Sequence, residues 1–151
     1  MSFAATILPF TSPQASGASE DARLLDAQQE KITVEYRILR APSKAPVARE
    51  LARLAVLYEM QATDLGHACY GQAMRFLIVL PSWLTPPELG LDPDGEVAFD
   101  WAHGDDMVSV SVGADGRLAY VWAIGDDEGS NGGGMALGLP VDLLAALKKI
   151  G

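Results

Sequence analysis

The stretch EVAFDWAHGDDMVSVSVGADGRLAYVWAI, residues 96–124, decides the fold class of this chain. Three runs inside it alternate large apolar residues with small or polar ones, and the runs are separated by His103-Gly104-Asp105-Asp106 and by Ala114-Asp115-Gly116. Period-two alternation is typical of strands with one buried face, and short Gly/Asp turns join antiparallel neighbours. The stretch therefore predicts a three-stranded antiparallel meander. We expect its large side chains to lie on only one or two faces, namely Phe99, Trp101, Val108, Val110, Leu118, Tyr120 and Trp122.

Helical patterns flank this meander on both sides. Pro46 opens one pattern, a second runs from about residue 64 to residue 80 and ends before Pro81, and Pro140 opens the last. We expect the second helix to pack through Ala68, Gly71, Met74, Leu77 and Ile78, and the last through Leu143, Leu144, Leu147 and Ile150. The predicted fold class is α+β: N-terminal helices, a three-stranded antiparallel meander (about 96–124) and a closing C-terminal helix.

The ends of the chain and its loops complete the expected organisation. Residues 1–18 carry no charge and are rich in Ser, Thr, Pro, Gly and Ala, which predicts a mobile tail. Residues 19–151 are expected to form a single α+β domain, with a short helix over residues 22–29 and a strand over residues 32–39. The polar, glycine-rich residues 126–134 are interpreted as a mobile loop.

Composition excludes several classes of protein. The chain has 151 residues and 49% apolar residues, enough for one domain with a real core. Its single cysteine, Cys69, excludes an internal disulfide framework. The first 22 residues contain no Lys or Arg and no apolar run is long enough for a membrane span, so we expect a cytoplasmic protein that does not enter a membrane.

Charge is distributed unevenly along the sequence. The formal net charge is −9, yet residues 1–75 hold equal numbers of acidic and basic residues, whereas residues 76–151 hold three basic and twelve acidic ones. This balance opposes binding to nucleic acid or to an anionic membrane. Two interpretations stay open: a solvated acidic surface that keeps the protein in solution, or a docking face for a basic partner.

The second half of the chain resembles a family of small bacterial proteins. The family pattern runs F-L-x-x-L-P, P-x-P-E, DPDGE-[IV]-x-[FL]-[ED]-W, SVS and DGRLxY. Matching residues are Phe76, Leu77, Leu80, Pro81, Pro87, Glu88, Asp92 through Val97, Phe99, Asp100, Trp101, Ser109 to Ser111, Asp115 through Leu118 and Tyr120, followed by Leu139, Pro140, Leu143 and Leu144. The resemblance covers about residues 76–150. It implies a common fold unit and no chemistry, because the family has no established activity.

Two histidines provide little material for catalysis. His67 and Cys69 are two residues apart, which places them on different faces of a helix, so a thiol–imidazole pair is not expected. His103 with Asp105 and Asp106 offers only three groups on one turn, too few for a convincing metal site. We therefore predict no catalytic residues.

Cofactor and metal motifs are incomplete. Residues 92–96, DPDGE, resemble the opening of a calcium loop, but glycine is fourth instead of sixth and the twelfth residue is His103 rather than an acid. Residues 132–134 are glycines without the Lys-Ser/Thr of a phosphate loop. We predict no cofactor and no metal.

These observations favour a non-enzymatic, acidic protein-interaction module that neutralises a basic protein partner, as an antitoxin, an immunity protein or a phage-type inhibitor does. The expected partner-binding residues are Asp105, Asp106, Asp126, Asp127 and Glu128. Two alternatives remain: a structural or self-assembling component that docks through its apolar N-terminal tail, and an enzyme or small-molecule binder with a pocket between sheet and helices.

Overall fold

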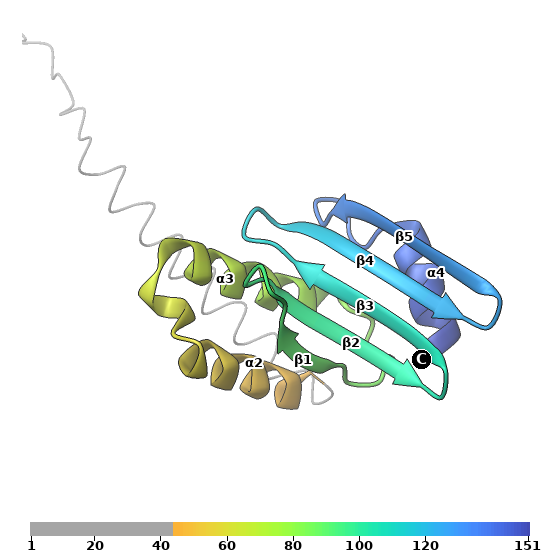
Figure 1. Cartoon of the computed structure of the whole chain (residues 1–151), viewed down its shortest axis with the longest axis horizontal. Coiled ribbons are helices and arrows are strands. Elements are labelled where there is room, and N and C mark those ends of the chain that lie inside the picture. Colours follow the sequence, from red (N-terminus) through yellow and green to blue (C-terminus); the bar gives the residue numbers. More distant parts are fainter. Residues whose placement is uncertain (1–43) are drawn as a thin grey trace, which may run out of the picture. The chain divides into compact units, whose positions relative to one another are not determined.

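A computed structural model describes residues 44–151, which contain one five-stranded antiparallel sheet with strands in sequence order (Figure 1). The strands are β1 (Glu88–Leu91), β2 (Val97–His103), β3 (Asp106–Val112), β4 (Arg117–Ile124) and β5 (Asp127–Gly134). The α+β class stands, but the expected three-stranded meander is wrong. The three expected strands are β2, β3 and β4, and one further strand pairs with each side of that set.

Both additional strands lack the alternation by which strands are recognised in sequence. β1 is only four residues long and directly follows Pro86 and Pro87. β5 has the sequence DEGSNGGG, and we expected it to be a mobile loop because glycine has low strand propensity. It pairs with β4 along its whole length, from Ile124 opposite Asp127 to Arg117 opposite Gly134. Backbone pairing, rather than apolar side chains, places this strand in the sheet.

The three α-helices of residues 44–151 occur where the apolar spacing predicts them, and a short 3-10 helix that was not expected lies between the first two. They are α2 (Ala45–Leu57), the short 3-10 helix η1 (Met60–Ala62), α3 (Asp64–Val79) and α4 (Val141–Ile150). Thr63 caps α3 through its Oγ1, which accepts a hydrogen bond from the Gly66 N–H at 3.0 Å. None of the helices in residues 44–151 is long and apolar enough to cross a membrane.

The packed faces of α3 and α4 agree with the expected ones only in part. In α3 the buried residues are Cys69, Ala73, Phe76 and Leu77, whereas Gly71 is exposed and Ala68, Met74 and Ile78 are half-buried. In α4, Leu143, Ala146 and Leu147 are buried, whereas Leu144 and Ile150 are half-buried. Leu77, Leu143 and Leu147 are buried as expected, and the small Ala73 and Ala146 are buried beside them, whereas Met74, Ile78, Leu144 and Ile150 lie at the margins of these faces.

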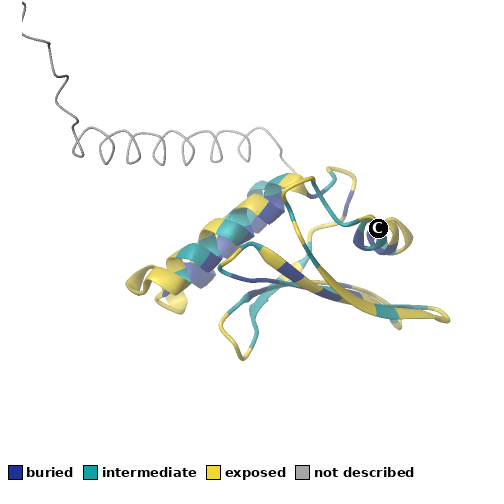
Figure 2. Ribbon diagram, turned by 90° about the horizontal axis from the view of Figure 1, so that it is seen from above, coloured by how far each residue is buried: buried dark blue, intermediate teal, exposed yellow. Residues whose placement is uncertain are grey.

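The core lies between the helices and one face of the sheet. Figure 2 shows the helices on one side of the sheet only. Val97, Phe99 and Trp101 of β2 alternate into this layer, and the Phe76 ring of α3 meets the Phe99 ring edge-to-face with centroids 4.8 Å apart. As expected, the large strand residues share one face of the sheet, and of the seven only Trp122 is half-buried rather than buried.

Several expectations fall outside the described residues. These are the mobile tail over residues 1–18, the helix over residues 22–29 and the strand over residues 32–39.

Candidate functional site

Two copies of the tripeptide Gly-Asp-Asp build the turns at one end of the sheet. Gly104 and Asp105 connect β2 to β3, and Gly125 and Asp126 connect β4 to β5. Both glycines have positive φ, 64° and 59°, which a residue with a side chain rarely adopts. Because consecutive strands of this sheet alternate in direction, every second turn lies at the same end. The repeated tripeptide therefore places its acidic residues together.

A direct hydrogen bond connects the two turns. The Asp106 carboxylate accepts from the Gly125 N–H at 2.8 Å, from Oδ1 to N. The structure thus brings all five expected partner-binding residues, Asp105, Asp106, Asp126, Asp127 and Glu128, to one end of the sheet, which we call the acidic end.

Two of these five carboxylates are occupied within the chain. The Asp106 carboxylate accepts the hydrogen bond from the Gly125 N–H. Asp127 accepts from the Trp122 Nε1 at 3.2 Å and forms an ion pair with the Lys149 Nζ at 2.5 Å. The hydrogen bond from Lys149, followed by that from Trp122, lowers the pKa of Asp127. Asp127 therefore connects β5 to α4, and it does not belong to a mobile loop.

Three carboxylates remain available at the acidic end. Asp105 and Asp126 occupy the second position of their turns, and Glu128 is the second residue of β5. All three side chains are exposed, and within residues 44–151 none of them has a hydrogen bond or ion pair. They are the groups of this site that can meet another molecule.

A polar network beneath β5 was not expected from the sequence. Asp142, in the first turn of α4, accepts from the Tyr120 hydroxyl at 2.5 Å and from the Asn131 Nδ2 at 2.7 Å. The hydrogen bond from Tyr120, followed by that from Asn131, lowers the pKa of Asp142. Burial, followed by the hydrogen bond to Asp142, raises the pKa of Tyr120 to about 12. The only sequence signal was an acid after Pro140, at a helix start.

A second acidic group lies at the opposite end of the sheet. Asp92 Oδ1 accepts from the backbone N–H groups of Asp94 and Glu96 in the turn before β2. Burial, followed by the negative charges of Asp92, Asp94 and Asp115, raises the pKa of Glu96. Among the described residues, no group of three or more His, Cys, Asp or Glu side chains is arranged to hold a metal ion. Nine of the twelve acidic residues of the second half are thus divided between the two ends, and Glu88, Asp100 and Asp142 lie elsewhere.

The face of the sheet opposite the core, the open face, carries mostly small side chains. Its strand positions are filled by Ala, Ser, Gly, Val and Met, with Glu88, Asp100 and Glu128 as its acids and Arg117 at the end remote from Glu128. Within residues 44–151 no helix covers it. A shallow hollow of about 290 Å³ lies there, lined by Ser109, Ser111, Ala119, Tyr120, Val121, Ser130 and Asn131.

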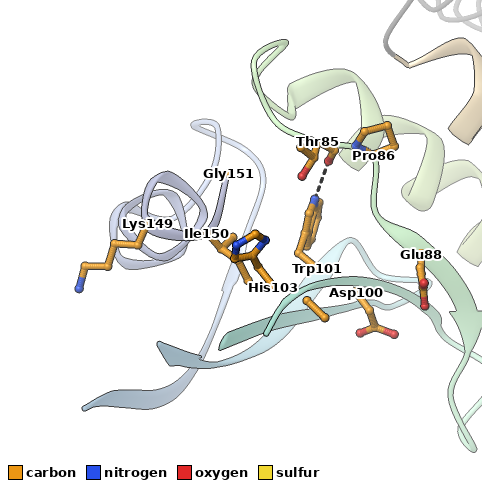
Figure 3. Close-up of a pocket in the computed structure, with 10 residues that line it drawn as sticks. Thr85, Pro86, Glu88, Asp100, Trp101, His103, Lys149, Ile150 and Gly151 are labelled. Atoms are coloured by element: carbon orange, nitrogen blue, oxygen red, sulfur yellow. Dashed lines mark hydrogen bonds between the residues drawn. The ribbon is translucent and has the colours of Figure 1, made fainter. Parts of the chain in front are cut away.

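A larger cavity, about 480 Å³, opens between the end of β2, the last turn of α4 and residues 85–88 (Figure 3). The Trp101 Nε1 donates to the Thr85 carbonyl at 2.8 Å on one wall. Figure 3 shows the Lys149 ammonium and the Asp100 carboxylate directed away from the Trp101 ring, and Lys149 binds Asp127 instead. The charged groups at this cavity do not converge on a common point.

Cys69 and His67 are also separated, as expected. Cys69 is buried in the core, and burial raises the pKa of its thiol. His67 is exposed, with its Nδ1 3.1 Å from the Gln61 Oε1. The two side chains do not form a nucleophile–base pair.

No family model matches the chain, and the comparisons with curated proteins and with solved structures give no match either. The resemblance of residues 76–150 to a family of small bacterial proteins stays a prediction.

Proposed function

We propose that this protein is a non-enzymatic protein-interaction module that binds and neutralises a basic protein partner through its acidic end. One observation carries the proposal: two hydrogen-bonded Gly-Asp-Asp turns gather five carboxylates, of which Asp105, Asp126 and Glu128 have no partner within residues 44–151. The backbone that carries these three residues is fixed by the hairpins and by the bond between the turns, so little backbone ordering entropy is lost when lysine or arginine side chains meet them.

The charge of the second half supports a basic partner. Residues 76–151 carry three basic and twelve acidic residues, so an approaching cation experiences attraction from many positions. A field of one sign accelerates the association of an oppositely charged protein and repels nucleic acid and anionic lipid. The proposal places this encounter in the cytoplasm, where a single reduced cysteine is ordinary.

The open face supplies contact area beside those charges. Glu128 belongs to both surfaces, because it is at the acidic end and its side chain is on the open face. Val121 and Met107 on that face are 43% and 42% exposed, which offers apolar area next to the acidic rim. A polar rim around a flatter apolar centre is the usual composition of a protein interface.

The test is affinity purification of the partner from the native host at low salt, with quantitative mass spectrometry. Two variants of equal charge change are compared with the wild type: Asp126→Lys at the acidic end and Asp94→Lys in an exposed turn at the opposite end. We expect a basic protein to be recovered with the wild type and with Asp94→Lys, and to be strongly depleted with Asp126→Lys. Equal recovery with both variants, or recovery of an acidic partner, would contradict the proposal.

A further inference from the structure

Within the part of the chain that the structure describes, the outer edge of β5 has no pairing strand. β5 is the last strand of the sheet, and within residues 44–151 no element pairs with its outer side (Figure 1). Ile124 and Asp127 close a two-residue turn, and the closing pair of such a hairpin is hydrogen-bonded. Hydrogen-bonded and non-hydrogen-bonded residue pairs alternate along an antiparallel ladder. The backbone N–H and C=O groups of Gly129, Asn131 and Gly133 therefore face β4. The backbone N–H and C=O groups of the intervening residues therefore face outward, namely Glu128, Ser130, Gly132 and Gly134.

One of these outward groups is already used. The Gly132 N–H donates to the Asn131 Oδ1 at 2.8 Å. The N–H groups of Glu128, Ser130 and Gly134 and the four carbonyls remain, and residues two apart along a strand are about 6.8 Å apart. A second strand presents its own donors and acceptors at the same spacing.

Lysine, proline and a β-bulge, which often protect an edge strand, are missing from β5, and its charged residues are confined to Asp127 and Glu128 at its start. Residues 127–134 contain no proline, no lysine and no large apolar residue, and four of the eight are glycines. Edge strands are usually shielded by lysine, proline or a bulge, and glycine in a strand often marks a place where another backbone approaches closely. An ideal Cβ at Gly134 would meet nothing within 4 Å, so the open face next to this end of β5 is uncovered by residues 44–151.

The inner side of β5 is firmly held. Asn131 binds Asp142, and Asp127 binds Lys149, so two residues of β5 are fastened to α4. An edge that is fixed before binding loses little conformational entropy when a strand is added.

We propose that the free edge of β5 binds an extended segment of the basic partner as a sixth, antiparallel strand. This inference rests on the proposed function, to which it adds the mode of binding. β5 starts at the acidic end, so an antiparallel segment finishes there, and its C-terminal half carries the Lys or Arg residues that meet Asp126 and Glu128. A second copy of this chain is a poorer occupant, because β5 has no basic residue and each chain carries a net charge of −9.

The probe is a displayed library of random twelve-residue peptides, selected on the full chain at low salt. We expect the selected peptides to lack proline and to carry Lys or Arg in their C-terminal half. Two substitutions at one position separate the backbone from the side chain. Ser130→Pro removes an outward N–H that β4 does not use, whereas Ser130→Ala keeps it. We expect at least about ten-fold weaker peptide binding for Ser130→Pro and wild-type binding for Ser130→Ala.

A second measurement covers the case in which Ser130→Pro does not fold. In the wild-type chain, amide hydrogen exchange is followed by NMR with and without a selected peptide. The proposal expects new protection at the Glu128, Ser130 and Gly134 amides, with little change at Gly129, whose amide already faces β4.

The outcomes distinguish this inference from the function on which it rests. Basic peptides that bind without protecting these amides would contradict strand addition but would still agree with a basic partner. Peptides without basic residues that protect these amides would overturn the basic partner and keep the edge as a strand-binding site. If no peptide is selected, or if sedimentation shows a dimer that Ser130→Pro abolishes, the proposed occupant is wrong.

Discussion

The Asp106 carboxylate accepts a hydrogen bond from the backbone N–H of Gly125 at 2.8 Å, although the two residues are nineteen positions apart in the sequence. The bond joins the turn between β2 and β3 to the turn between β4 and β5. The β3–β4 ladder ends at Met107 opposite Ala123, so this bond fastens the two turns to each other beyond the end of the ladder. With the bond in place, the acidic residues of both turns are held in one arrangement.

Loss of this bond is expected to lower stability at the acidic end. Asp106→Ala removes a charged acceptor and should reduce the free energy of unfolding by about 1–2 kcal/mol, near the lower end of the about 1.5–3 kcal/mol typical of hydrogen bonds to charged groups, because Gly125 is exposed. Asp105→Ala is the matched control, because Asp105 is exposed and has no bond within residues 44–151. Urea unfolding measures both. Equal stability of the two variants would mean that the bond does not couple the turns.

Glycine is required at position 129 and dispensable at position 134. A Cβ at Gly129 would overlap the Trp122 indole, whereas a Cβ at Gly134 would meet nothing within 4 Å. Gly129→Ala should displace the indole from Asp127 and destabilise the protein by about 1–3 kcal/mol, as overpacking does. Gly134→Ala should change stability by no more than about 0.5 kcal/mol. Thermal unfolding of the two variants measures the difference. If Gly129→Ala had the stability of the wild type, the indole would not pack on β5.

Alkaline pH should weaken the network around Asp142. Burial, with the bond to Asp142, raises the pKa of Tyr120 to about 12, whereas a tyrosine in an unfolded chain titrates near about 10. The folded protein therefore holds this proton more tightly, so the stability contributed by Tyr120 is complete below pH ~10 and is lost as the pH rises through about 12. Urea unfolding should show that fall, and Tyr120→Phe should reduce it. Tyr58→Phe, at an exposed tyrosine, is the control. If the free energy of unfolding of Tyr120→Phe fell with rising pH as steeply as that of the wild type, the fall could not be attributed to Tyr120.

The closing helix should respond to truncation at Leu147 more than at Leu144. Leu147 is fully buried against the sheet, and Leu144 is only half-buried. Leu147→Ala should cost about 2–5 kcal/mol through lost burial and a cavity, whereas Leu144→Ala should cost about 1 kcal/mol or less. Calorimetry on the two variants measures the difference. If Leu144→Ala were the more damaging change, the orientation of α4 would be wrong.

Much of the fold could be predicted because its central strands alternate large and small residues. Val97, Phe99 and Trp101 identify β2 directly, since a period of two puts all three on one face. β5 could not be identified in this way, because glycine leaves no hydrophobic pattern and its pairing depends on backbone hydrogen bonds. The repeated Gly-Asp-Asp was the available signal, since it marks two hairpins of the same kind.

The candidate site was predicted in composition but not in geometry. The sequence places Asp105 and Asp126 in separate segments, and only the order of strands in the sheet brings their turns to the same end. The ion pair between Asp127 and Lys149 and the bonds around Asp142 depend on where α4 packs, which local patterns do not determine. For the same reason Leu144 was expected in the core, because helical spacing identifies an apolar face but not its centre.

The most direct test of the account is the association rate of the purified partner with wild-type chain, Asp126→Lys and Asp94→Lys, measured over a range of salt concentrations. Exposed charges are screened beyond about 10 Å at 0.1 M salt, so a steered encounter slows steeply as salt is added. We expect Asp126→Lys to slow association and to flatten its salt dependence, while Asp94→Lys leaves both close to wild type. Equal rates and equal salt dependence for all three proteins would contradict the account, because the acidic end would then have no part in binding.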